Sequence, residues 1–470
     1  MAREHAGTAG TSPADRVVEA ADAAGLALVR FLYVDHGGVV RGKATSRQRL
    51  SERLVTGIGL TVAMQAMSML DELQPVEGLG PVGEIRLVPD PDTLVILPYA
   101  AGAGAMVADM VRLDGAPWEA CPRAFLKQAV TELAGEGLAL VAAFEPEFTL
   151  GRRVPDPGGG PDRLVPVDES LCFSSTGFAA AHDYAVELVR ALEAQGLTVE
   201  QYYPELGHGQ QELSIRHATA LQAADNQVWY RETARGVALR HGLWASFAPK
   251  PIPDQAGNGA HVHASLWTLD RDGGVARNAL HDPADPNGLS ETAYHWIGGI
   301  LAHLPALVAL TCGSVNSYRR LVPQSWSSAF TCWGRDNREA AVRVPSRMWG
   351  LDEASTNLEL KCSDATGNPY LALGALIHAG LDGVRNKLDP GQPTDVDPAS
   401  LSSSARRRSG IHRLPDSLDA ALDALERDEL LMAVLGPVRR TAYLAVKRSE
   451  AASFGARDAA FECFHHFTKF

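Results

Sequence analysis

Two glutamates that share one face of an otherwise apolar strand constrain this chain more than any other feature of its sequence. The segment Phe144-Glu145-Pro146-Glu147-Phe148 ends a strand-like run that begins at Leu138, and strand alternation directs Glu145 and Glu147 to the same side. Two unneutralised carboxylates on a buried face repel each other, and their burial is costly. The fold must therefore either expose this strand edge to solvent or bring a cation to the two carboxylates.

Three further segments contain residues that suit such a cation. One has a Gly-rich turn between two glutamates, one has two histidines in alternation, and one has an acid and a lysine on the same strand face. The oxygen-rich set suits Mg²⁺ or Mn²⁺ better than zinc, because hard cations prefer carboxylates and water. The sequence therefore predicts a two-metal cluster, with these candidate ligands: Glu145, Glu147, Glu205, Glu212, His261 and Glu359.

A basic stretch complements the acidic set in a chain whose formal net charge is −13. Guanidinium groups bind carboxylates and phosphates in bidentate geometry, so such a stretch suits a polyphosphate together with a carboxylate substrate. A solvated arginine-bearing loop is the alternative interpretation. The five arginines fall within 25 residues: Arg319, Arg320, Arg335, Arg338 and Arg343.

Charge and composition restrict the class of partner. The acidic surface disfavours nucleic acid and anionic lipid, which leaves small molecules as the expected partners. We find no apolar run of about 18 residues or more, and residues 1–15 lack the apolar core of a signal peptide. A cytoplasmic protein with no membrane partner is expected. The six cysteines are scattered without a CxxC pair, which predicts reduced thiols rather than disulfides or zinc ligands.

The pattern of apolar residues and turns predicts an α+β protein with two main domains. Short strands separated by Gly and Pro turns extend to about residue 110, and residues 114–118 mark a boundary. Longer helical patterns alternate with strands beyond that point. We therefore expect a loose tail over residues 1–14, a small β-rich domain over 15–110 and a catalytic domain over 111–470. The longest expected helices span residues 179–195, 218–241, 280–312 and 370–386.

Seven motifs resemble those of glutamine synthetases, in the order and at roughly the spacing found in that family. The resemblance extends from about residue 15 to the C-terminus. It implies a β-grasp N-terminal domain, a large catalytic domain of the glutamine synthetase type, and a ring homo-oligomer of twelve subunits or a similar number. In such rings the N-terminal domain of one subunit completes the site of its neighbour. The motifs are Glu145-Pro146-Glu147-Phe148, Gly209-Gln210-Gln211-Glu212, Phe247-Ala248-Pro249-Lys250-Pro251, Gly259-Ala260-His261-Val262-His263, Asn316-Ser317-Tyr318-Arg319-Arg320-Leu321-Val322-Pro323, Trp333-Gly334-Arg335-Asp336-Asn337-Arg338 and Asn368-Pro369-Tyr370-Leu371.

The resemblance implies an ATP-dependent carbon–nitrogen ligase that joins glutamate to an amine through γ-glutamyl phosphate. It assigns Glu147, Glu205 and Glu212 to a first Mg²⁺ or Mn²⁺, and Glu145, His261 and Glu359 to a second. It assigns Arg338 and Arg343 to the transferring phosphoryl group and the nucleotide, His263 and Ser265 to the nucleotide, and Gly257, Arg320 and Lys361 to glutamate. Lys361 stands where many members have an arginine, which weakens the assignment of the acyl donor because lysine cannot form a bidentate fork.

Two departures from the family concern the amine. Family members that use ammonia have a glutamate shortly after the Leu-Val-Pro tripeptide, where this chain has Trp326. They also have an ammonium-binding aspartate loop, whereas residues 62–69 here include Met64 and Met67. Large apolar groups in place of acids favour a bulkier amine over ammonium. We therefore expect a γ-glutamylamide as the product. An ammonia-dependent glutamine synthetase and a non-catalytic homologue that senses nucleotide or amino acid are the alternatives.

Overall fold

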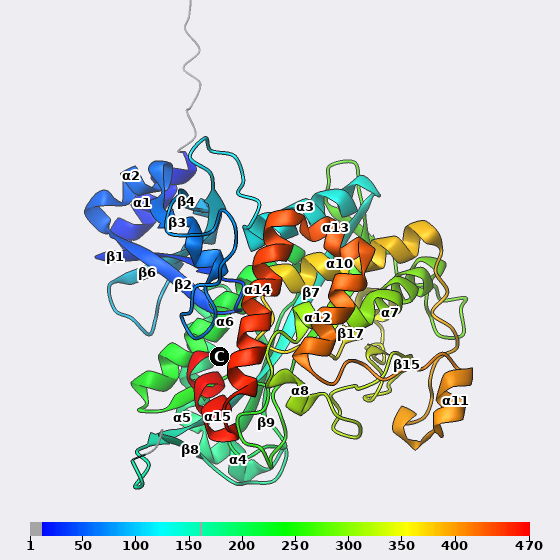
Figure 1. The fold of residues 1–470 in the computed structure, drawn as a ribbon. Helices are drawn as coiled ribbons and strands as arrows, with labels where there is room; N and C mark the ends of the chain where they lie inside the picture. The colour runs from blue at the N-terminus through cyan, green and yellow to red at the C-terminus, as the bar shows by residue number, and fades with distance from the viewer. Residues whose placement is uncertain (1–11, 160–161) are drawn as a thin grey trace, which may run out of the picture.

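A computed structural model describes residues 12–159 and 162–470 of the chain (Figure 1). Most of the expected loose tail, residues 1–11, lies outside the described residues. The first helix, α1 (Pro13–Ala23), begins within the expected loose tail, two residues before the expected start of the N-terminal domain at residue 15. Ser12 caps this helix, since its hydroxyl accepts a hydrogen bond from the Asp15 N–H, and Pro13 is favoured at a first helical position.

The N-terminal domain is a six-stranded sheet in the order β2-β1-β6-β4-β3, with β5 paired to β6. β1 and β6 are parallel, and the other pairs are antiparallel. Helices α1 and α2 (Leu50–Thr56) pack their apolar residues into the same core as this sheet. The strands are β1 (Leu28–Val34), β2 (Val40–Ser46), β3 (Ile58–Thr61), β4 (Glu84–Pro89), β5 (Val95–Ile96) and β6 (Ala103–Val111).

The second sheet has eleven strands, and its main path runs β15-β16-β17-β13-β7-β10-β9. The long β7 pairs with β13 on one side and β10 on the other. The two sheets and the helices between them confirm the predicted α+β class. The strands are β7 (Leu138–Val154), β8 (Arg163–Pro166), β9 (Val199–Pro204), β10 (Gln210–Ile215), β11 (Ala218–Thr219), β12 (Trp244–Ser246), β13 (Ala260–Leu269), β14 (Val275–Asn278), β15 (Trp333–Arg335), β16 (Val342–Val344) and β17 (Leu358–Leu360).

The helices from α3 onwards come after the N-terminal sheet in the chain, and they pack around the large sheet. Helix α14 (Pro437–Gly455) runs between the two domains (Figure 1). Four short 3-10 helices complete the elements, namely η1 (Arg47–Arg49), η2 (Val62–Ala66), η3 (Pro91–Thr93) and η4 (Pro398–Ser400). The helices are α3 (Pro122–Gly135), α4 (Ser175–Ala180), α5 (His182–Glu193), α6 (Ala220–Arg240), α7 (Glu291–Thr311), α8 (Ser317–Arg320), α9 (Asp352–Ser355), α10 (Pro369–Asn386), α11 (Ser403–Arg408), α12 (Leu418–Arg427), α13 (Glu429–Leu435), α14 (Pro437–Gly455) and α15 (Ala459–Lys469).

Helix α7 is shorter than the sequence pattern suggested, because the expected helix over residues 280–312 begins only at Glu291. The preceding residues form a turn in which the Asp285 carboxylate accepts hydrogen bonds from the N–H groups of Asn287 and Leu289. By length and composition α7 resembles a membrane-spanning helix, but most of it is buried inside the protein. It packs mainly on α10 and α12, as a core helix does.

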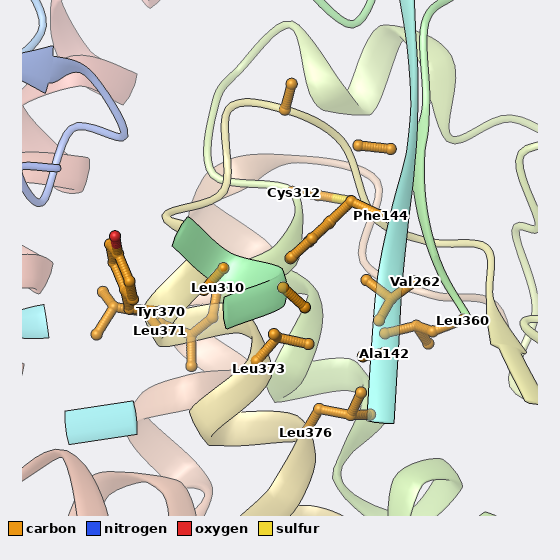
Figure 2. Packing of buried hydrophobic residues seen from close by; sticks show 14 of the residues in the cluster. Ala142, Phe144, Val262, Leu310, Cys312, Leu360, Tyr370, Leu371, Leu373 and Leu376 are labelled. Atoms are coloured by element: carbon orange, nitrogen blue, oxygen red, sulfur yellow. The ribbon is translucent and has the colours of Figure 1, made fainter. Parts of the chain in front are cut away.

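Alternation along three adjacent strands separates the core from a polar face. Phe144, Val262 and Leu360 point to the same side of the sheet, where they meet apolar residues of α10 such as Leu373 and Leu376 (Figure 2). Because side chains alternate in a strand, the residues next to these three lie on the opposite face. Those neighbours include three of the six candidate metal ligands, namely Glu145, His261 and Glu359, so the packing of the core fixes where the polar face lies.

The two domains are joined by buried polar contacts with α14. The Lys447 ammonium donates to the Gly37 carbonyl at 3.1 Å, and the Glu450 carboxylate accepts the Met69 N–H at 2.7 Å. Gly38 has φ +84°, and a side chain there would collide with the Thr366 carbonyl, so glycine is required at this turn. The hairpin turn of the N-terminal domain is therefore fitted closely to the catalytic domain.

Candidate active site

The polar face of the large sheet brings the candidate ligands together from neighbouring strands. On β13, His261 pairs with Glu145 of β7, and His263 pairs with Glu359 of β17. On the other side of β7, Glu147 pairs with Glu212 of β10. The next strand, β16, places Arg343 opposite Glu359. The candidates thus form one continuous row across five adjacent strands.

The acid-rich half of the site contains Glu147 and Glu212 of this row, together with Glu205, which directly follows β9. One oxygen of Glu147 accepts hydrogen bonds from the Gln210 side chain at 2.8 Å and from the Gly259 N–H at 2.9 Å. Burial, together with the charges of Glu145 and Glu147, raises the pKa of Glu212 to about 11. Burial and the charge of Glu147 also raise the pKa of Glu205. Ionisation of all three carboxyl groups is therefore unfavourable in the protein alone, and a bound divalent cation would stabilise the ionised forms.

The other half of the row is balanced by histidines and cations. Glu145 lies 3.3 Å from the His263 Nε2 atom, and Glu359 lies 3.2 Å from the His261 Nδ1 atom. Burial opposes ionisation of both carboxylates, yet the two histidines lower the pKa of Glu145, and Lys361 with the histidines lowers that of Glu359. Both acids are therefore held as carboxylates.

The potential ligand atoms of Glu145, His263 and Glu359 all lie within 4.8 Å of one another. His261, the histidine that the family resemblance assigns to the metal, accepts a hydrogen bond from the Arg320 guanidinium at 2.8 Å. Both imidazoles contact the same two carboxylates. The division of roles between a metal ligand and a nucleotide contact stays a prediction.

The three residues predicted to bind glutamate lie beside this row. Arg320 is buried against Gly257 and Gly259, where a side chain would meet the Arg320 side chain. The second contact of the Arg320 guanidinium is the Ser363 carbonyl at 3.3 Å. The buried Lys361 lies 3.4 Å from Glu359. The structure thus brings Gly257, Arg320 and Lys361 together next to the metal candidates.

The residues predicted to bind the nucleotide lie towards the other end of the row. Arg343 forms an ion pair with Glu359 at 2.7 Å, and the Arg338 side chain is exposed on the loop between β15 and β16. Ser265 follows His263 on the same face of β13, and its hydroxyl accepts a hydrogen bond from the Trp267 indole at 2.9 Å. This end of the row is more open and more cationic than the carboxylate cluster.

The predicted amine-pocket residues lie in two different domains of the chain. Trp326 belongs to the loop after α8 and is 57% exposed. Met64 lies in η2 and packs at the edge of the N-terminal core, and Met67 forms a β-bridge with Leu73. A pocket with both parts is expected only between neighbouring subunits, and this arrangement stays a prediction.

Several residues with a place in the site were not singled out from the sequence. The Tyr203 hydroxyl donates a hydrogen bond to Glu212, which the register of the β9–β10 hairpin would have indicated. Phe173 has φ +57°, is 60% exposed and stacks edge-on against Tyr203 with ring centroids 5.1 Å apart. Glu339 accepts backbone hydrogen bonds from the Trp326 loop. No local sequence pattern pointed to Phe173 or Glu339.

A separate cavity in the described part of the chain lies away from this row. Its volume is about 700 Å³, and it lies where β1, β2, α6 and the C-terminus meet, with Arg41, Tyr99 and Trp244 in its lining. None of the candidate site residues named above lines it. The chemistry of the side chains, and not the size of a cavity, identifies the site.

Comparison with known proteins defines the class as an ATP-dependent carbon–nitrogen ligase. Residues 13–118 match the model of the glutamine synthetase N-terminal domain, and residues 119–465 match that of the glutamine synthetase catalytic domain. The chain belongs to the glutamine synthetase family. Enzymes of this family use ATP and divalent metal ions, act on small molecules and are commonly oligomeric.

Similar proteins of known name include a gamma-glutamylpolyamine synthetase and several glutamine synthetases. The chain is 37% identical over 435 residues to a gamma-glutamylpolyamine synthetase of Streptomyces coelicolor, covering 92% of this chain and 91% of that protein. It is 34% identical to a glutamine synthetase of Pyrococcus abyssi, and the match covers 91% of this chain and 90% of that protein. A solved structure of a novel glutamine synthase homolog aligns with TM-score 0.83 and 35% identity over 95% and 99% of the two chains. A GmaS/ADP complex aligns with TM-score 0.81 and 30% identity over 96% and 98%.

Proposed function

We propose that this enzyme joins the side-chain carboxylate of glutamate to a primary amine larger than ammonium. The proposal rests mainly on Trp326, an exposed indole on the loop that follows the glutamate-binding candidate Arg320. An indole provides neither a charge to attract ammonium nor a base to deprotonate it. It does provide an apolar face for an alkyl or aromatic group, and a π-system for a cationic amine.

The metal ions of the proposal are Mg²⁺ or Mn²⁺, held in two sites. The first site would use Glu147, Glu205 and Glu212, and the second Glu145, His261 and Glu359. The clustering of carboxylates on one buried face fits this requirement, because burial and mutual repulsion raise the pKa values of Glu212 and Glu205, and a bound cation would favour their ionised forms. When bound, such ions would neutralise the phosphate oxygens during phosphoryl transfer.

Glutamate would be oriented by Arg320, the Gly257 backbone and Lys361. A γ-carboxylate oxygen attacks the γ-phosphorus of ATP, the bond from phosphorus to the β–γ bridging oxygen breaks, and ADP leaves. Arg338 and Arg343 would stabilise the charge on the transferring group. The amine nitrogen then attacks the acyl carbon, phosphate leaves, and the amine loses a proton to solvent or to a nearby group. Because Trp326 cannot accept that proton, we expect the rate to rise with pH.

Names of relatives support an amine acceptor without fixing its identity. One relative is named for polyamines, and others are named glutamine synthetase. Polyamines and short alkylamines are therefore the first classes to test. We further propose a ring homo-oligomer in which Met64 and Met67 of a neighbouring subunit complete the apolar side of the acceptor site.

The test is glutamate-dependent ADP release with a panel of ammonium, methylamine, ethanolamine, polyamines, aniline and short alkylamines. We expect the best amine to exceed ammonium in kcat/KM by about tenfold or more. Trp326→Glu should reduce that ratio, because it restores an acid at the family position. If ammonium is the preferred acceptor of the parent protein, the chain is a divergent ammonia-dependent glutamine synthetase instead.

The second alternative is a homologue without activity that senses nucleotide or amino acid. The presence of every proposed metal ligand, together with Arg338 and Arg343, argues against it. ATP turnover with any acceptor in the panel would exclude this alternative.

A further inference from the structure

The loop that carries Trp326, residues 322–328 and here termed the acceptor loop, has an unusual backbone. Gln324, Trp326 and Ser328 all have positive φ, at +60°, +55° and +66°. Residues other than glycine adopt this conformation at a cost and keep it only where the surrounding structure imposes it. Trp326 is 57% exposed, so packing of its own side chain does not impose the conformation.

A single buried carboxylate holds this backbone in place. One Glu339 oxygen accepts the Trp326 N–H at 2.7 Å, and the other accepts the Gln324 N–H at 3.3 Å. Glu339 is itself 7% exposed, and its own N–H is held by the Asn337 side chain at 3.0 Å. Hydrogen bonds from N–H groups to a carboxylate are stronger than neutral ones. Glu339 is thus a rigid anchor for two of the three residues with positive φ.

The anchor connects two parts of the proposed reaction site. On one side of the acceptor loop, the Ser327 hydroxyl donates to the Arg320 carbonyl at 2.7 Å. On the other, the Ser328 hydroxyl donates to the Ala340 carbonyl at 2.9 Å, and Glu339 directly follows Arg338 in the chain. The loop is therefore tied between a glutamate-binding candidate and a phosphate-binding candidate.

We infer that Glu339 is a positioning residue for the amine: its carboxylate fixes the acceptor loop so that the Trp326 indole faces the incoming acceptor. The role of Trp326 in this inference rests on the proposed function. The clamp itself, meaning the two hydrogen bonds from the Gln324 and Trp326 N–H groups to the Glu339 carboxylate, does not depend on it. Glu339 touches no reacting atom in this scheme, and its effect passes through the backbone of Gln324 and Trp326. Loss of the clamp should therefore weaken amine binding while leaving the ATP and metal sites intact.

The test compares Glu339→Gln and Glu339→Asp with the parent enzyme. A glutamine side chain keeps one acceptor oxygen but presents an amide NH₂ to the second N–H donor, so one hydrogen bond is lost. We expect KM for the best amine to rise about tenfold in Glu339→Gln, as for loss of one charge-assisted hydrogen bond. KM for ATP should stay within about twofold, and Glu339→Asp should recover part of the loss.

Hydrogen exchange tests the clamp without reference to the acceptor. In Glu339→Gln the amides of Gln324 and Trp326 should exchange at least about tenfold faster, whereas amides of β13 should be unchanged. Gln324→Asn is the matched control, because it removes the side-chain hydrogen bond to Asp397 and retains the backbone N–H that Glu339 binds. Asparagine also tolerates positive φ.

Two outcomes would overturn the inference. Unchanged exchange of the two amides in Glu339→Gln would show that the clamp does not hold the loop. Faster exchange with an unchanged amine KM would show that the loop does not position the acceptor. Either result is distinct from failure of the proposed function, which would appear as a preference for ammonium in the parent enzyme.

Discussion

Removing the Trp326 indole should cost the enzyme its selectivity for a large amine. A tryptophan presents about 150–250 Å² of surface, and 57% of this residue is exposed. An alkyl group that covers about half of that exposed surface would bury roughly 60 Å², which is worth about 1.5 kcal/mol at ~25 cal/mol per Å². This free energy corresponds to about a tenfold change in kcat/KM.

The perturbation is Trp326→Ala, and the assay is glutamate-dependent ADP release at saturating ATP and metal. We expect kcat/KM for the best amine to fall about tenfold, while the value for ammonium stays within about twofold because ammonium has no apolar surface to bury. The matched variant is Trp326→Phe, which keeps an aromatic face and should lose less than about threefold. An equal loss of kcat/KM for ammonium and for the amine in Trp326→Ala would refute the reasoning. An unchanged kcat/KM for the amine would refute it as well.

Three further outcomes test the site, the assembly and the fold. Glu212→Ala and Glu359→Ala should each reduce ATP turnover by at least about 100-fold, because each removes a proposed ligand; turnover within about threefold of the parent would exclude the two-metal assignment. Light scattering should give a ring oligomer, and a monodisperse active monomer would exclude a site completed by Met64 and Met67. Hydrogen bonds to Asp428 and Asp382 raise the pKa of His303 despite its burial. The protonated His303 imidazole therefore stabilises the folded protein below the unfolded pKa of about 6.5, and this stabilisation is lost as pH rises through the folded pKa. The loss of thermal stability in His303→Gln, about 1 kcal/mol, should therefore be larger near pH 6 than near pH 9, and an equal loss at both would contradict this.

Strand alternation made the polar face of the site predictable from sequence. Glu145 and Glu147 had to share a face, as did His261 and His263, and the structure places these residues in one row. The register between strands was not predictable in the same way, because Glu359 is brought opposite His263 by pairing between segments far apart in sequence. Local periodicity thus fixes which side a residue faces, and long-range pairing fixes its neighbour.

Helix boundaries depended on turn chemistry that periodicity does not detect. The apolar pattern favoured one helix over residues 280–312, but the chain contains Pro283 and Pro286, and the Asp285 carboxylate binds N–H groups of the following turn. Proline disfavours helical conformation in the residue before it. Glu339 was missed for a related reason, since its partners are backbone groups in another segment and leave no mark in its own sequence neighbourhood.

The two segments of the proposed acceptor site, the acceptor loop and residues 62–69, are each held by a buried carboxylate that accepts a backbone N–H. Glu339 holds the Trp326 N–H at 2.7 Å, and Glu450 of α14 holds the Met69 N–H at the same distance. Each carboxylate is buried, and each holds the backbone of a segment where the family resemblance predicts an acid-bearing loop in ammonia-using members. Rigid backbone support matters more for an apolar pocket than for a charged one, because dispersion and burial depend on close contact whereas a charge acts over distance. A change from ammonium to a larger amine therefore requires anchors for these segments as well as new side chains, and a transplant of Trp326 alone into an ammonia-using relative should gain less amine selectivity than a transplant that includes Glu339.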